Sequence, residues 1–417
     1  KASNYNNVDS IALISGYVDK YSRDSIAHGK VVGDTVSSSR FMVGVFDDWR
    51  IGLESFAEAN NKVVKGRTWA GGAPYGWNSW GVLQEKVSYQ SVIDAMNFIH
   101  DNLMPNGFYD KQGKVLMSLD SYWSNLNDAQ MLQFVDSCKK MNMIPGAYMC
   151  PFADWGGYDR PINGTSLFTW KDTWLKVKGK TVNYSGALCM DPTHPATKIS
   201  IKSQIDHMRR LGIKYIKMDF MCHGAIEADG WYNKNVHTGT QAYNEGMDFI
   251  RKQCGDSICI DLSISPIFPY QYTEGRRISC DAYSSIDNTQ YVMNSTSYGW
   301  WIDKLYVFND PDNLVLKSIY QNGTETLGEN RARITSGAVT GMFTASDNYS
   351  TTVDRGYPTM SKTLAKDLFT NVEINEIART CKSFHPVDGN EAGVDGAENL
   401  MTYENDDYVY LSVINYN

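Results

Sequence analysis

The sequence predicts an α/β protein built around a (β/α)8 TIM barrel, with flanking β-rich segments. Two observations support this prediction. From residue 74 onward, short runs rich in apolar and β-branched residues alternate with longer amphipathic segments, which is the pattern of parallel strands joined by helices. Eight strand candidates can be counted in this alternation, and a closed barrel requires eight βα units.

The region before the barrel, residues 1–70, is predicted to contain the tail of an N-terminal β-rich domain and a linking helix. Residues 39–45 alternate in the manner of a strand, and residues 52–59 have the spacing of a short helix. The catalytic barrel itself is expected to occupy residues 71–386.

Within the barrel, the expected elements follow one another in a regular order. The strands are placed at residues 75–80, 115–120, 144–148, 213–220, 257–263, 277–281, 301–308 and 336–345. Amphipathic segments between them are predicted to be helices, at residues 129–141, 200–211 and 240–254.

Two segments depart from this alternation. The connection over residues 152–198 is long and rich in Trp, Gly and Pro, and such a loop is usually functional or an inserted subdomain, so we expect it to overhang the pocket. Residues 407–414 have the pattern of a strand. Because a lone strand needs partners, residues 387–417 are predicted to be the start of a C-terminal β-domain.

The amino-acid composition limits the classes of molecule that the protein is expected to bind. The net charge of the 417 residues is −8 and no block of Lys and Arg occurs, which argues against a nucleic-acid or anionic-membrane partner and favours a neutral substrate. No apolar run approaches the roughly 18 residues of a membrane span, and no signal-type segment is present at Lys1. The 11 Trp and 26 Tyr residues include candidate platforms for sugar faces, although most are expected in the core.

No cofactor or metal is expected. The eight Cys residues are scattered, without a CxxC pair or a Cys/His cluster at zinc spacing. A Gly-rich phosphate loop is also missing from the sequence, which speaks against a nucleotide cofactor.

Two acidic residues follow predicted strands and are the candidate catalytic pair. Asp219 ends the strand at 213–220, and Asp281 ends the strand at 277–281. Cleavage of a glycosidic bond requires two such carboxyl groups. Lys217 points to the same side of its strand as Asp219 because side chains repeat with a period of two. The alternative interpretation is a salt bridge at the barrel rim.

Four ordered motifs connect these acids to a known group of proteins. They are Gly-Trp-Asn-Ser-Trp-Gly at 76–81, Lys-Tyr-Ile-Lys-Met-Asp at 214–219, Arg-Ile-Ser-Cys-Asp at 277–281 and Asn-Asp-Pro-Asp-Asn-Leu at 309–314. Over roughly residues 74–386 the chain resembles clan D glycoside hydrolases, families 27 and 36, the α-galactosidases and α-N-acetylgalactosaminidases. Asp-Pro-Thr-His-Pro at 191–195 is similar to the family 36 side of the clan.

The resemblance implies roles for individual residues. Asp219 would be the nucleophile of a retaining, double-displacement mechanism, and Asp281 would be the general acid/base. The implied substrate-binding residues are Trp80 behind the sugar, Asp120 at the distal hydroxyls, Tyr148 after the third strand, Lys217 at a hydroxyl, Ser265 beside the 2-position, Arg277 near the 2-position, and Asp312 in the family loop.

Two positions depart from the family pattern. Where an Asp-Asp pair is usual, this chain has Asp120-Ser121, which weakens or replaces one contact to the 4- and 6-hydroxyls and bears on galactose selectivity. Ser265 stands where an acid beside the 2-hydroxyl is frequent. A small side chain there would leave room for an acetamido group, or Ser265 could merely cap the following segment.

The expected function is that of a glycoside hydrolase. The first reading is a retaining exo-α-glycosidase that hydrolyses terminal α-D-galactosyl residues of oligosaccharides or glycoconjugates, in a secreted, periplasmic or lysosomal-type compartment. The alternatives are an α-N-acetylgalactosaminidase, a glycosyltransferase-like relative of raffinose-synthase type, and a non-catalytic carbohydrate-binding barrel.

Overall fold

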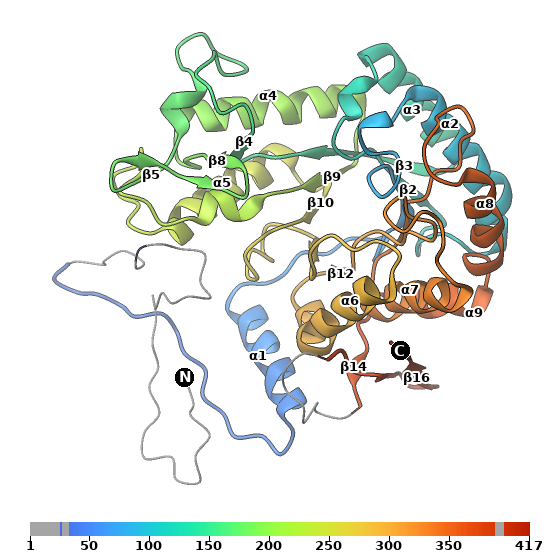
Figure 1. The fold of residues 1–417 in the computed structure, drawn as a ribbon. Coiled ribbons are helices and arrows are strands. Elements are labelled where there is room, and N and C mark those ends of the chain that lie inside the picture. Colours follow the sequence, from blue (N-terminus) through green and yellow to red (C-terminus); the bar gives the residue numbers. More distant parts are fainter. Residues whose placement is uncertain (1–25, 27–32, 388–395) are drawn as a thin grey trace. The chain divides into compact units, whose positions relative to one another are not determined.

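The computed structural model describes residue 26 and residues 33–387 and 396–417. Its residues group into two compact units (Figure 1). We call the described residues of 47–149, 206–219 and 254–417 the barrel unit, and the described residues of 26–46, 150–205 and 220–253 the insert unit. The candidate site residues named above all belong to the barrel unit.

A parallel sheet of eight strands forms the centre of the barrel unit. Its strands are β1 (Tyr75–Asn78), β2 (Val115–Ser118), β3 (Met143–Met149), β9 (Tyr215–Met218), β10 (Cys259–Leu262), β11 (Gly275–Arg277), β12 (Phe308–Asp310) and β13 (Phe343–Ala345). They lie in the order β12-β11-β10-β9-β3-β2-β1-β13. Most of their residues are buried on both faces, as parallel strands covered by helices require.

The two outer strands of this order are joined as well. An isolated parallel bridge links Asn309 of β12 to Gly341, just before β13, and the Met342 N–H donates to the Asn309 carbonyl over 3.0 Å. A Cβ at Gly341 would lie 2.8 Å from the same carbonyl oxygen, so the close approach depends on glycine. The arrangement is compatible with a closed (β/α)8 barrel, as predicted.

Helices follow most strands of the sheet in chain order. They are α2 (Tyr89–Phe98), α3 (Asp128–Lys140), α4 (Pro195–Leu211), α5 (Gly239–Cys254), α6 (Ile286–Gly299), α7 (Leu327–Thr340), α8 (Pro358–Leu368) and α9 (Val372–Ala378). Helix α3 illustrates their origin, because Asn127 and Gln130 form a capping box at its start. Its buried residues Met131, Phe134 and Cys138 share one face, which is the side that a barrel helix buries.

Several expected element boundaries were wrong. The strand expected at 277–281 ends at Arg277, so Asp281 lies in the loop that follows it. The first half of residues 301–308 belongs to the 3-10 helix η7 (Trp300–Lys304), and the first part of 336–345 continues α7. No helix lies between β10 and β11 over the described residues 263–274. Short apolar runs fit a buried helix as well as a buried strand, so periodicity could not place these boundaries.

The helix expected at residues 52–59 is confirmed as part of the longer helix α1 (Trp49–Val63). Its aromatic residues pack on η7 in edge-to-face contacts, with Trp49 5.2 Å from Trp300 and Phe56 5.9 Å from Trp301 between ring centroids. The strand expected at 39–45 is wrong, because these residues form no strand and are exposed. Most of the rest of the expected N-terminal β-rich tail lies outside the described residues.

The long connection after β3 contributes most of the described part of the insert unit. This unit contains a three-stranded sheet of β4 (Ala153–Asp154), β8 (Ala187–Cys189) and β7 (Asn183–Tyr184), and a hairpin of β5 (Lys176–Val177) and β6 (Lys180–Thr181). It buries an apolar cluster of its own, made by Leu175, Cys189, Ile226, Ala228, Trp231 and Ala242. A placement over the site stays a prediction.

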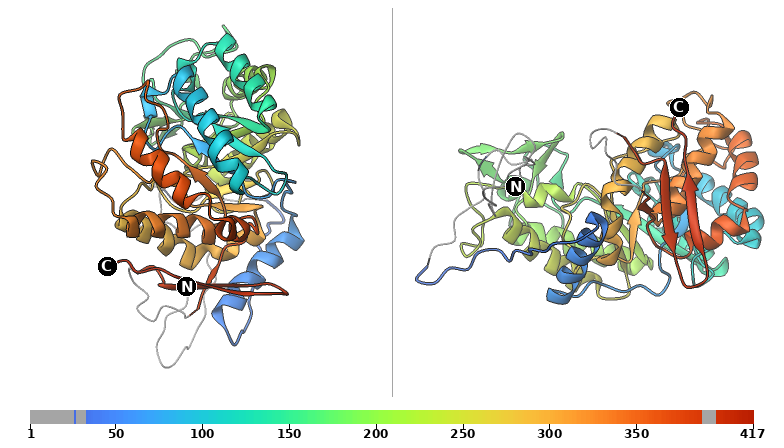
Figure 2. Two further views of the ribbon diagram at one scale, coloured as in Figure 1. Left: turned by 90° about the vertical axis from the view of Figure 1, so that its right-hand side faces the viewer. Right: turned by 90° about the horizontal axis from the view of Figure 1, so that it is seen from below.

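An antiparallel sheet ends the barrel unit. It is formed by β14 (His385–Pro386), β15 (Leu400–Glu404) and β16 (Val409–Val413), and the last two lie side by side in Figure 2. The strand predicted at 407–414 is therefore confirmed as β16. Its sheet packs through Met401 and Ile414 against Met293 of α6 and Val339 of α7. That residues 387–417 begin a larger domain stays a prediction.

None of the helices in the described ranges has the length and apolar character that crossing a membrane would require.

Candidate active site

Polar side chains lie where the barrel strands end. Asn78 is the last residue of β1, and Asp310 is the last residue of β12. Lys217 lies in β9, and Asp219 directly follows that strand. In a sheet of parallel strands these carboxyl ends meet at one edge, which is where barrel enzymes carry their chemistry. The structure therefore brings residues from widely separated segments of the sequence to one edge of the barrel unit.

The deepest element of this site is an ion pair between Lys217 and Asp120. Lys217 Nζ lies 2.8 Å from Asp120 Oδ2, and the two side chains expose only 7% and 3% of their surface. Asn78 Nδ2 donates to the same oxygen over 2.8 Å, and the Asp120 N–H donates to Ser79 Oγ over 2.9 Å. Burial lowers the pKa of Lys217, but the charges of Asp120 and Asp219 outweigh it and raise the pKa overall.

This ion pair leads to a stability prediction. In Lys217→Met, Asp120 would remain buried without its counter-ion, so we expect the free energy of unfolding to fall by about 3–5 kcal/mol. Urea unfolding measures the change. The double variant Lys217→Met/Asp120→Asn should lose less than the sum of the two single losses. As a matched control, Lys304→Met breaks the half-exposed pair with Glu54 and should cost below about 1 kcal/mol. Additive losses in the double variant would contradict the coupling.

Asp219 lies beside this pair and is itself 7% exposed. The Tyr148 hydroxyl donates to Asp219 Oδ2 over a long 3.4 Å, and the Asp219 N–H donates to the Met149 carbonyl over 3.0 Å. Lys217 Nζ also lies 5.8 Å from the centre of the Tyr148 ring. Asp219 is thus held on a short, hydrogen-bonded stretch of backbone, next to a permanent positive charge.

Arg277 and Asp312 form a second charged cluster with Asp281. Arg277, whose side chain is 2% exposed, places one guanidinium nitrogen 2.8 Å from Asp281 Oδ1 and the other 3.4 Å from Asp312 Oδ1. The Ala282 N–H donates to Asp312 Oδ2 over 2.7 Å, which ties the two loops together. The Asp281 side chain keeps 52% of its surface exposed, so this carboxyl group can reach solvent or a ligand.

The two acidic groups of this second cluster are perturbed in opposite directions. Burial raises the pKa of Asp281; Arg277 lowers it, and the charges of Asp312 and Asp219 raise it again, so that it is raised overall. Burial also raises the pKa of Asp312, but Arg277 and Lys217 outweigh it and hold it below its usual value. Because the charge of Asp219 acts on Asp281, the two predicted catalytic acids share one electrostatic environment. A carboxyl group with a raised pKa is suited to donate a proton.

The remaining predicted residues are placed less centrally. The Trp80 N–H donates to Asn78 Oδ1 over 2.8 Å, which fixes the residue just beyond β1. The Ser265 hydroxyl donates to the Pro266 carbonyl over 3.0 Å, and the Arg276 guanidinium donates to the Ser265 carbonyl over 3.1 Å. Ser265 is therefore engaged within its own turn, and its contact with a sugar stays a prediction.

Sequence reasoning assigned no role to three polar residues of this edge. Asn78 orients Asp120, and Asp310 accepts the Asp312 N–H over 2.7 Å. Asp261 of β10 is 1% exposed and accepts from the Tyr215 hydroxyl over 2.7 Å; burial and the charge of Asp310 raise its pKa. All three lie in or at the end of a buried strand, and that position could have marked them as candidates, although it does not reveal their partners.

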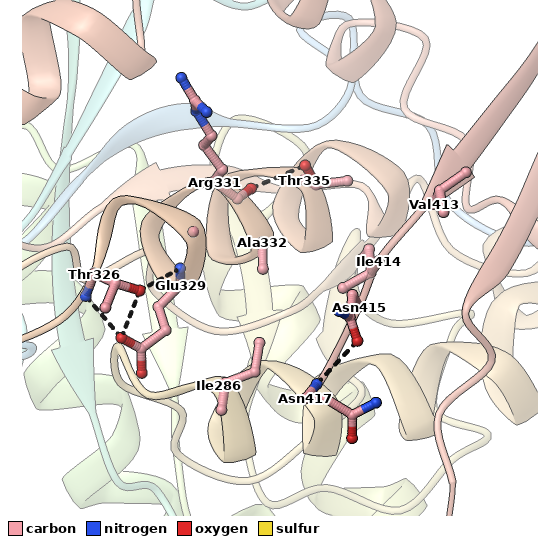
Figure 3. A pocket seen from close by; sticks show the side chains of 11 residues that line it. Ile286, Thr326, Glu329, Arg331, Ala332, Thr335, Val413, Ile414, Asn415 and Asn417 are labelled. Carbon is pink, nitrogen blue, oxygen red and sulfur yellow. Dashed lines mark hydrogen bonds between the residues drawn. The ribbon is translucent and has the colours of Figure 1, made fainter.

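A separate hollow of about 560 Å³ lies between α6, α7 and the end of the chain (Figure 3). Side chains of Ile286, Ala332 and Ile414 point toward it, and the Thr326 and Glu329 capping box closes one side. None of the predicted site residues lines it. This hollow is therefore separate from the strand ends that carry the candidate acids.

No protein-family model matches the chain. Solved structures do share its fold. An α-galactosidase from Thermus thermophilus, in complex with p-nitrophenyl α-D-galactopyranoside, superposes with a TM-score of 0.56 at 15% identity over 77% of this chain. This chain spans 65% of the length of that enzyme.

Two further structures match over a larger share of their own length. A GH27 β-L-arabinopyranosidase from Geobacillus stearothermophilus has a TM-score of 0.57 at 15% identity, covering 82% of this chain and 83% of that one. A putative α-N-acetylgalactosaminidase from Bacillus halodurans has a TM-score of 0.55 at 14% identity, covering 81% and 82%. The chain therefore shares its fold with these glycosidases, as the sequence motifs implied.

Proposed function

We propose that this protein is a retaining exo-α-glycosidase that hydrolyses terminal α-D-galactosyl residues of oligosaccharides or glycoconjugates. The observation that carries the proposal is the joint position of Asp219 and Asp281. One lies next to Lys217, the other is paired to Arg277, and the charge of the first acts on the second. The fold shared with galactosidases supports the reaction class.

The two acids divide the reaction between them. Asp219 attacks the anomeric carbon and forms a covalent glycosyl ester, while Asp281 gives its proton to the departing glycosidic oxygen. Asp281, now ionised, takes a proton from water, and the resulting attack on the anomeric carbon frees Asp219. Two inversions at one carbon return the original α configuration.

The buried polar residues orient the sugar. Lys217 and Asp120 form one hydrogen-bonding unit for the distal hydroxyls, because both are desolvated and already paired. Trp80 supplies an aromatic face behind the ring. Tyr148 and Arg277 contact the nucleophile and the acid respectively, and Asp312 holds Arg277 in place. We propose that Ser265 lies beside the 2-position of the sugar.

The proposal also concerns the identity of the sugar at the cleaved end. Ser121 replaces an acid near the 4- and 6-hydroxyls, and its N–H donates to Asp120 Oδ1 over 2.8 Å. Ser265 provides a small side chain near the 2-position, which favours α-N-acetylgalactosaminidase as the second candidate. A secreted, periplasmic or lysosomal-type compartment is proposed with either substrate.

A panel of aryl α-glycosides tests the assignment. Aryl α-galactoside, α-N-acetylgalactosaminide and α-glucoside differ only at the 2- and 4-positions. The ratio of their kcat/KM values therefore reports on the residues that contact these two positions. Proton NMR of the first product formed gives the anomeric configuration. An initial β product would contradict a retaining mechanism, and transfer to an added sugar in preference to water would favour the glycosyltransferase-like alternative.

Arg277 leads to a prediction about pH dependence. The Asp281 proton donor must be protonated, so its pKa sets the alkaline limb of kcat/KM. Arg277 lowers that pKa. In Arg277→Met the pKa should rise further, and the alkaline limb should move to higher pH while kcat/KM at the optimum falls about 10- to 100-fold through the lost substrate contact.

Two control variants accompany this measurement. Arg277→Lys keeps the positive charge, so its alkaline limb should remain nearer to that of the wild type. Arg276→Met changes the neighbouring arginine, which bonds the Ser265 and Pro266 carbonyls instead, and should leave the limb in place. A limb that moves to lower pH in Arg277→Met would refute the assignment of Asp281.

A further inference from the structure

Tyr122 is an exposed aromatic residue with an unusual backbone conformation at the edge of the candidate site. It lies two positions after Asp120, and its φ of 67° and ψ of 11° place it in the left-handed region. A residue with a bulky side chain is rarely found there, because its Cβ crowds the following carbonyl. Tyr122 nevertheless exposes 49% of its surface, so burial of the ring does not account for the conformation.

The backbone on both sides of Tyr122 holds it in this conformation. The Trp123 N–H donates to the Asp120 carbonyl over 3.1 Å, and the Asn125 N–H donates to the Tyr122 carbonyl over 2.9 Å. The Trp123 indole N–H donates to the Tyr148 carbonyl over 3.0 Å. The chain thus turns sharply after Asp120, and the Tyr122 side chain at this turn is half exposed. Strain that is maintained in this way often marks a functional position.

The ring of Tyr122 shares its orientation with that of Trp80. The two ring planes are 5° from parallel, with centroids 6.4 Å apart. Trp80 comes from the loop after β1 and Tyr122 from the loop after β2, so two aromatic rings from separate segments are stacked next to Asp120. Tyr122 lies further from the core than the Lys217–Asp120 pair, which is more than nine-tenths buried.

We propose that Tyr122, whose ring is stacked against that of Trp80, forms a platform that binds a second pyranose ring of an oligosaccharide, next to the terminal sugar that Trp80 backs. A pyranose has an apolar face of C–H groups, and such a face stacks on an aromatic ring with loss of water from both. The buried charged pair suits the hydroxyls of the terminal sugar, whereas the half-exposed, uncharged Tyr122 ring suits the next sugar outward. The inference rests on the proposed function for the terminal sugar.

The proposal makes Tyr122 a specificity-determining residue, and binding rather than turnover tests it. In the full chain with Asp219→Asn, which cannot complete the reaction, calorimetry would compare methyl α-D-galactopyranoside with stachyose, which ends in two linked galactosyl residues. Asn tolerates the left-handed conformation without supplying a ring. Adding Tyr122→Asn should weaken stachyose binding about tenfold, and at least about threefold more than it weakens binding of the methyl glycoside.

Two controls separate the effect of losing the Tyr122 ring from effects on the backbone and from the loss of any exposed ring. Adding Tyr122→Phe keeps the ring and should retain most of the stachyose affinity. Adding Tyr408→Asn removes another exposed tyrosine ring, from the turn before β16, and should change neither affinity. Equal losses for both sugars in Tyr122→Asn, or no loss for stachyose, would overturn the platform.

If the proposed hydrolase function is wrong, the binding experiments give a different result from the one expected if the platform is wrong. If wild-type protein binds stachyose but hydrolyses no glycoside, the hydrolase assignment fails, and a selective loss in Tyr122→Asn still supports the platform. If neither galactosyl ligand binds, the same comparison is made with methyl α-D-glucopyranoside and isomaltotriose. Absence of binding by all four ligands would overturn the platform together with the sugar site.

Discussion

Replacing Asp219 with Asn is expected to abolish hydrolysis while leaving the fold intact. A carboxamide cannot form the covalent glycosyl ester, so kcat should fall by more than about a thousandfold, even for a substrate with an activated aryl leaving group. The fold should survive because Lys217 keeps its 2.8 Å pair with Asp120, and the amide oxygen can still accept from Tyr148. Steady-state kinetics and thermal unfolding of the same preparation measure the two effects.

The stereochemistry of chemical rescue provides a sharper check on this residue. In Asp219→Gly the space left by the side chain admits azide, which should attack the anomeric carbon once and give a β-glycosyl azide. As a control, Asp367→Asn changes an exposed acid on α8 and should keep activity within about twofold of the wild type. Substantial hydrolysis of an activated aryl glycoside by Asp219→Asn would rule out the nucleophile assignment.

Replacing Asp281 with Ala is expected to have an effect that depends on the leaving group. Without the proton donor, hydrolysis of natural glycosides or methyl glycosides should slow about 10²- to 10⁴-fold, because their alkoxide leaving groups need protonation. A dinitrophenyl glycoside needs none, so formation of its glycosyl-enzyme should slow far less. The alkaline limb of the pH profile should disappear, since the raised pKa of Asp281 sets that limb in the wild type.

Azide also distinguishes this residue from the nucleophile. In Asp281→Ala the intact Asp219 still forms the glycosyl-enzyme, and azide then replaces water, so the product should be an α-glycosyl azide. Because half of the Asp281 side chain is already exposed, its loss should not unfold the protein. Equal losses on activated and poor leaving groups, or a β-azide product, would refute the acid/base role.

The individual residues show where sequence reasoning succeeded. The run at 214–219 has the apolar, β-branched character of a buried strand and ends in a charged pair, and the structure places β9 there, with Lys217 and Asp219 at its carboxyl end. Asp281 was assigned to a strand, but it lies in a loop after β11. Its place beside Arg277 was still predictable, because a spacing of four residues keeps it close to the strand end.

Asn78 and Asp261 were given no role in the site because their contacts join strands far apart in the sequence. Asn78 meets Asp120 between β1 and the end of β2, and Asp261 meets Tyr215 between β10 and β9. Neither contact leaves a local pattern. The sharp turn at Tyr122 was missed for a related reason, since nothing in its neighbouring residues demands a left-handed conformation.

By itself, the sequence determined the alternation of strands and helices, the order of the motifs and which acids are proposed for catalysis. These properties depend on local periodicity and residue type, which a linear pattern records. Only the tertiary structure decided which charges are paired, how far each is buried, and in which direction each pKa moves. Those quantities depend on distances between segments that are remote in the chain, and the assembly of the strands into one sheet sets those distances.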